Sequence, residues 1–62
     1  MNIGERILQY RANHKKTQKE MAHLLDEKPN MIWKAENNVN LHSVNRVRLE
    51  LKMDRLEMEE LK

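Results

Sequence analysis

Three short stretches of the chain each place a capping side chain three residues ahead of a glutamate. They run from Asn2 to Glu5, from Thr17 to Glu20 and from Asp54 to Glu57. In such a capping box, the two side chains satisfy backbone N–H groups that the start of a helix leaves without partners. Because this signal recurs in a chain with only one glycine and one proline, the sequence predicts an all-α fold.

Two weaker signals add further helix starts. Pro29 suits the first turn of a helix, where its missing N–H would have no partner in any case. Asn40 is a good cap for a helix that begins at the next residue. Together the signals predict one compact domain over residues 1–62 with five short helices, at about 3–13, 18–25, 29–37, 41–51 and 55–61.

One segment also has the pattern of a strand. Between Arg46 and Asp54, polar and apolar residues alternate strictly, and a strand over residues 46–53 is therefore an alternative. A helix is favoured because apolar residues at helical spacing extend a stripe from the cap at Asn40. These residues are Leu41, Val44, Val47 and Leu51.

Composition excludes several classes of function. A chain of 62 residues has room for a binding face but hardly for a catalytic cleft, and we expect no enzyme, no cofactor and no small-molecule substrate. The absence of cysteine suits a reducing cytoplasm. His14, His23 and His42 lack the spacing of metal ligands, and no apolar run is long enough for a signal peptide or a membrane span.

The net charge of +2 hides an asymmetry along the chain. Residues 6–19 contain five cations and no acid, whereas residues 50–62 contain five acids and three bases. A solvated helix surface would explain both runs. The alternative is a basic face toward a polyanion, with the acidic segment turned away from it.

The central part of the chain has the outline of a helix-turn-helix motif, with its core at about residues 17–37. The stretches "IGERI" with Arg11, "TQKEMAHLL", and Ile32 followed by "ENN" resemble the Cro/phage-repressor family, the xenobiotic-response-element type with a lambda-repressor-like fold. The likeness extends over nearly the whole chain. Asp26 stands where the family usually has a turn glycine, and Glu27 where it usually has a buried aliphatic residue.

The resemblance implies roles for several residues. Arg11 on the first helix would pair with Glu36 near the end of the third helix and lock the two helices together. Gln18 and Asn37 would each contact a DNA phosphate, and Ile32 would anchor the third helix in the core.

A helical wheel for residues 29–37 gives the DNA-facing side independently of the family. At 100° per residue from Pro29, Asn30, Trp33 and Lys34 fall between about 40° and 140°, whereas Ile32 and Ala35 fall at about 300° and 240° on the other side. Asn30 can pair with adenine and Lys34 with guanine or a phosphate, while Lys28 at the helix entrance suits a phosphate. For Trp33, contact with thymine methyl groups, an anchor in a protein interface and a place in the core all remain open.

These features predict a sequence-specific transcriptional regulator that binds operator DNA as a homodimer. The dimerisation region is expected at about residues 44–62, with an interface formed by Val47, Leu51, Met53 and Leu56. The alternative is an antirepressor, a domain of the same fold that binds another regulatory protein through Trp33 and Met31.

Overall fold

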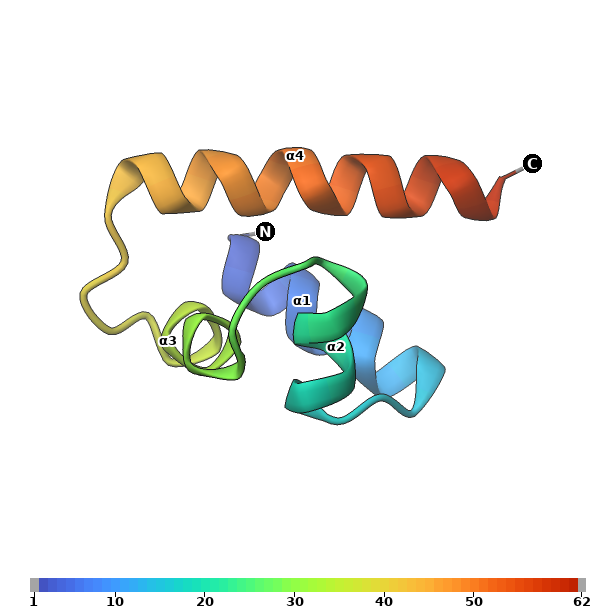
Figure 1. Ribbon diagram of the computed structural model, residues 1–62, viewed down its shortest axis with the longest axis horizontal. Helices are drawn as coiled ribbons and strands as arrows, with labels where there is room; N and C mark the ends of the chain where they lie inside the picture. Colours follow the sequence, from blue (N-terminus) through green and yellow to red (C-terminus); the bar gives the residue numbers. More distant parts are fainter. Residues whose placement is uncertain (1, 62) are drawn as a thin grey trace.

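The helices of the protein form a small bundle crossed by one long C-terminal helix (Figure 1). The computed structural model describes residues 2–61. In this range there is no strand, and the four helices are α1 (Ile3–His14), α2 (Gln18–Leu24), α3 (Pro29–Asn37) and α4 (Ser43–Glu60). The fold is all-helical, as the capping signals predict, but it has four helices in place of the expected five.

The first three helices begin where their capping residues predict. The Asn2 side chain accepts a hydrogen bond from the backbone N–H of Glu5 at 2.8 Å. Thr17 and Glu20 form a complete capping box, with both hydrogen bonds at 3.0 Å. Pro29 is the first residue of α3, where its fixed φ is already helical. These local signals therefore determine the boundaries of α1, α2 and α3 almost to the residue.

The core lies where α1, α2 and α3 converge beneath α4. The backbones of α1 and α3 come close together at Gly4 and Ala35, since a Cβ at residue 4 would overlap the Ala35 carbonyl oxygen. The only glycine of the chain thus sets the distance between α1 and α3. The buried core side chains are Ile3, Ile7, Tyr10, Met21, Ala22, Leu25, Ile32, Ala35, Leu49 and Met53.

The C-terminal third differs from the prediction. A single helix, α4, replaces the helices expected at 41–51 and 55–61, and the alternative strand at 46–53 is also wrong. Asp54 and Glu57 lie in the middle of α4 and do not start a helix. Within a helix, their three-residue spacing puts both carboxylates on one face, and both pair with Arg6 of α1. The same spacing therefore serves an ion pair in place of a cap.

The alternation that suggested a strand is produced by two faces of one helix. Leu49 and Met53, one turn apart, are fully buried against the core. Val47 and Leu51, also about one turn apart, lie on the opposite face and are exposed. Apolar residues at every second position therefore alternate between two opposite faces of α4. Only the face with Leu49 and Met53 is covered by the core.

The link between α3 and α4 also differs from the prediction. Asn40 does not cap a helix but adopts a left-handed conformation with φ of 47°, as does Asn38 with φ of 53°. Asparagine tolerates this region better than most residues. The helix begins later than predicted, at Ser43, after His42 at the cap position without a side-chain capping bond.

Candidate functional site

The outer face of α3, which we define by Asn30, Trp33, Lys34 and Asn37, lies on the side of the helix away from its buried residues. Ile32 and Ala35 on the opposite side are buried. The Trp33 side chain is 45% exposed, and it lies outside the core, as the helical wheel indicates. Asn30 and Asn37 are exposed, and Lys34 is half-buried. Every side chain of this face is neutral or basic.

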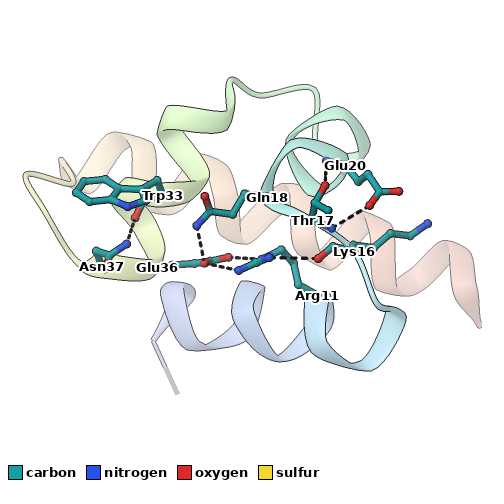
Figure 2. Close-up of polar contacts among 8 residues, drawn as sticks. All are labelled: Arg11, Lys16, Thr17, Gln18, Glu20, Trp33, Glu36 and Asn37. Carbon is teal, nitrogen blue, oxygen red and sulfur yellow. Dashed lines mark hydrogen bonds and ion pairs between the residues drawn. The ribbon is translucent and has the colours of Figure 1, made fainter.

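Behind the outer face, an ion pair joins α1 to α3 (Figure 2). The Arg11 guanidinium donates from Nε and Nη2 to the two carboxylate oxygens of Glu36, at 2.7 and 2.8 Å. It also donates from Nη1 to the Lys16 carbonyl at 3.2 Å, which ties in the link to α2. The hydrogen bonds with Glu36 raise the pKa of Arg11, although burial of the guanidinium opposes this. The structure thus brings together the two residues that the resemblance pairs.

Two side-chain amides flank this pair and are each held by one hydrogen bond. Gln18 donates from Nε2 to the Glu36 carboxylate at 3.0 Å, and Asn37 donates from Nδ2 to the Trp33 carbonyl at 2.9 Å (Figure 2). An amide NH2 group carries two hydrogens, so each amide keeps a second donor after its internal bond is made. Both are therefore oriented by the fold while a donor remains for a ligand.

The turn between α2 and α3 is joined to α4 by a cluster of ion pairs that was not expected from the sequence. Asp26 takes the left-handed conformation, with φ of 53°. The Glu27 side chain is only 8% exposed and accepts hydrogen bonds from Arg48 at 2.7 and 3.2 Å and from Lys52 at 2.7 Å. Lys52 also donates to the Asp26 carbonyl at 3.2 Å. In the sequence, the one signal for this cluster is that Arg48 and Lys52 stand one helical turn apart, which puts two bases on one side of α4.

The cluster determines the charge that Glu27 presents. Burial alone would raise the pKa of the Glu27 carboxyl, but hydrogen bonds from Arg48 and Lys52 outweigh it and lower that pKa. The carboxylate is therefore ionised and neutralised by two cations of α4. Glu27 thus joins the turn to α4 through two ion pairs.

The acidic C-terminal segment lies along α1 and pairs with it. Arg6 donates to Asp54 at 2.7 Å and to Glu57 at 3.1 and 3.0 Å. One α-helical turn farther on, the Tyr10 hydroxyl donates to Glu60, and burial together with this bond raises the pKa of Tyr10 to about 12. The predicted basic face thus loses Arg6 to α4 and Arg11 to Glu36. Among the cations of residues 6–19, Lys15 and Lys19 are exposed without an ion pair in the described part of the chain.

The remaining predicted site residues divide between surface and core. Lys28 is exposed at the start of α3 and makes no side-chain capping bond. Of the predicted dimer interface, Val47 and Leu51 are exposed, but Met53 is fully buried and Leu56 is half-buried against the core. Met53 and Leu56 belong to the inner face of α4 and pack against the core, so their prediction as dimer-interface residues was wrong.

Trp33 and Met31 do not form one surface. Met31 is half-buried against the core and lines a hollow that also includes Lys28, Asn30 and Arg48. Trp33 does not line this hollow. A protein-binding surface centred on both residues, as the antirepressor alternative requires, would have to extend around α3 past Asn30 and Lys34.

Comparisons with protein families, with characterised proteins and with solved structures found no match to this chain. In residues 2–61, no group of three or more histidine, aspartate or glutamate side chains is arranged to hold a metal ion. None of the helices described there has the length and apolarity needed to span a bilayer.

Proposed function

We propose that the protein is a sequence-specific DNA-binding transcriptional regulator of the Cro/repressor helix-turn-helix type, acting in the cytoplasm on operator DNA. The observation that carries this proposal is the outer face of α3, which is free of acidic side chains and rigidly supported from behind by the Arg11–Glu36 pair. A helix held in this way can enter a major groove with few side chains to order on binding.

The proposed contacts follow from side-chain chemistry. Asn30 can donate to and accept from adenine, and Lys34 can donate to guanine O6 and N7. The exposed indole of Trp33 offers apolar area for thymine methyl groups. The remaining amide hydrogens of Gln18 and Asn37 would bind phosphates on the two sides of the groove, where they fix the position of the helix without selecting a sequence.

Lys28 and the turn complete the proposed contact surface. Lys28 is exposed at the entrance to α3 and suits a phosphate contact. The neighbouring Glu27 does not oppose an approaching polyanion strongly, because Arg48 and Lys52 neutralise it. One helix reads only about four base pairs, so useful specificity requires a homodimer on two half-sites one helical turn apart.

The salt dependence of binding to duplex DNA tests this proposal. Fluorescence anisotropy with a random-sequence duplex should show affinity that falls steeply as salt rises, because phosphate contacts release counterions. Lys28→Gln removes a proposed phosphate contact and should reduce the slope of log affinity against log salt by about one. Lys15→Gln removes the same charge far from the outer face and should leave the slope unchanged. Absence of duplex binding at low salt, or equal effects of both variants, would refute the proposed surface.

A further inference from the structure

α4 carries a second apolar face, directed away from the core, that nothing in the monomer covers. We call it the outer stripe, and its members recur at intervals of three, four or seven residues, so they share one side of the helix. Each member is more than half exposed. They are Val44, Val47, Leu51 and Met58 of α4, with Leu61 at the C-cap that follows it. A seam with this spacing is the pattern by which two helices pack along their length.

Charges on the two flanks of the outer stripe are segregated by sign between residues 48 and 57. At 100° per residue, the bases lie on one flank and the acids on the other. Only Arg46 and Glu59, outside this stretch, break the pattern. The basic flank consists of Arg48, Lys52 and Arg55, and the acidic flank consists of Glu50, Asp54 and Glu57.

The monomer uses most of these charges internally. Arg48 and Lys52 bind Glu27, and Asp54 and Glu57 bind Arg6. Glu50 and Arg55 are exposed and form no side-chain hydrogen bond or ion pair within residues 2–61. The monomer thus leaves one acid and one base unused, on opposite sides of an uncovered apolar seam.

We propose that the outer stripe of α4 is covered by the same stripe of a second copy of this chain, with the two α4 helices parallel. In a parallel pair, the basic flank of one helix borders the acidic flank of the other, so each Glu50 meets Arg55 of the second copy. In an antiparallel pair, like flanks would meet, and Arg48 and Arg55 would face each other across the seam. Asp54 interrupts the stripe, but Arg6 already offsets its charge.

The parallel arrangement has a consequence for α3. Figure 1 shows α3 beneath the N-terminal end of α4, and the hollow shared by Met31, Lys34 and Arg48 places it there as well. Parallel α4 helices bring both copies of α3 to the same end of the dimer, whereas antiparallel helices separate them. This consequence rests on the proposed function, because a single duplex must be reached by both α3 helices.

Disulfide trapping tests the orientation directly, because the natural chain has no cysteine. Val44→Cys and Met58→Cys place a thiol near either end of the outer stripe, about 21 Å apart along α4. In a parallel pair, each variant alone should form a disulfide-linked dimer on mild oxidation. In an antiparallel pair, neither variant alone should crosslink, but an equimolar mixture should. Leu8→Cys, on α1 and outside the stripe, is the matched control and should stay monomeric.

Sedimentation without DNA tests the surface itself. Leu51→Asp should weaken self-association at least about tenfold, while Leu24→Asp, at another exposed leucine, should not. Glu50→Arg should weaken it, and Glu50→Arg combined with Arg55→Glu should restore it, because the exchange keeps a parallel pair complementary. A natural chain that stays monomeric up to about 300 µM would overturn the proposal.

Crosslinking only in the mixture of cysteine variants would overturn the parallel orientation. None of these measurements involves DNA, so they are independent of the proposed function. Self-association by this route without duplex binding would refute the DNA-binding proposal alone. Duplex binding by a chain that never self-associates would refute the parallel dimer alone.

Discussion

Replacing Arg11 with alanine should destabilise the protein by about 2–3 kcal/mol. The Glu36 side chain is only 6% exposed and would lose two hydrogen bonds of 2.7 and 2.8 Å, keeping Gln18 as its remaining partner. Removing one partner from a fully buried ion pair costs about 3–5 kcal/mol. Because the Arg11 side chain is itself 19% exposed, water can reach the vacated space and reduce this cost.

Thermal unfolding followed by circular dichroism measures the effect. For a domain of this size, 1 kcal/mol corresponds to about 4–8 °C, so Arg11→Ala should lower the Tm by about 10–20 °C. Arg46→Ala is the matched control, because Arg46 is exposed and makes no ion pair within residues 2–61, and it should change stability by less than about 0.5 kcal/mol.

A second variant keeps the measurement interpretable if Arg11→Ala proves too unstable to give a transition. Arg11→Lys retains the positive charge but loses the planar fork that donates to both oxygens of Glu36, so it should cost less, about 1 kcal/mol. Equal melting temperatures for Arg11→Ala, Arg46→Ala and the natural chain would refute the reasoning. The α1–α3 pair would then have no structural role.

Three further outcomes are expected. Gly4→Ala should cost about 1–3 kcal/mol or more in denaturant unfolding, since its methyl group would overlap the Ala35 carbonyl and push α1 from α3. Folding lowers the pKa of Glu27, so the stability that this carboxylate contributes to the fold is complete above its ordinary pKa and is lost as pH falls through the lowered value. Glu27→Gln should therefore flatten the decline in Tm below about pH 5. Trp33→Ala should leave the Tm nearly unchanged but weaken specific DNA binding by about 1–3 kcal/mol, with little effect on random DNA.

The first half of the fold was predictable because its signals are local. A capping signal needs only four consecutive residues, and both the Asn2 cap and the Thr17 capping box act on the residues that immediately follow them. Pro29 acts in the same way at the start of α3. The starts of these three helices thus follow from neighbouring residues, so sequence reasoning placed them correctly.

The C-terminal third was not predictable from local signals, because two different structures share one residue spacing. An acid three residues before another acid caps a helix at its start, but in mid-helix it places two carboxylates on one face. The position of Arg6, 48 residues earlier in the chain, decides between the two for Asp54. A contact that distant has no signature in the segment itself.

The candidate site divides in the same way. A helical wheel places Trp33, Asn30 and Lys34 correctly on the exposed side of α3, because burial on a helix follows its period. The ion cluster at Glu27 was missed, because its partners Arg48 and Lys52 come from a helix more than 20 residues away. A helical wheel of α3 shows which of its own residues share a face, but not which distant residues contact the turn that precedes α3.

Ion pairs flank the short apolar contact that attaches α4 to the rest of the protein. Its buried apolar residues are only Leu49 and Met53, with Leu56 half-buried. Ion pairs with Arg6 and Glu27 secure the two flanks. Partly exposed ion pairs contribute little each, about 0–1 kcal/mol, so α4 is held less firmly in the monomer than its length suggests.

Covering the outer stripe would therefore stabilise the helix that the monomer holds least firmly. The ion pairs on the flanks would also be shielded from water and strengthened by the second copy. Folding of α4 and self-association are then coupled, and the melting temperature should rise with protein concentration. The weak apolar attachment of α4 and its uncovered stripe have one physical origin, since the apolar residues of this segment are divided between two opposite faces of a single helix.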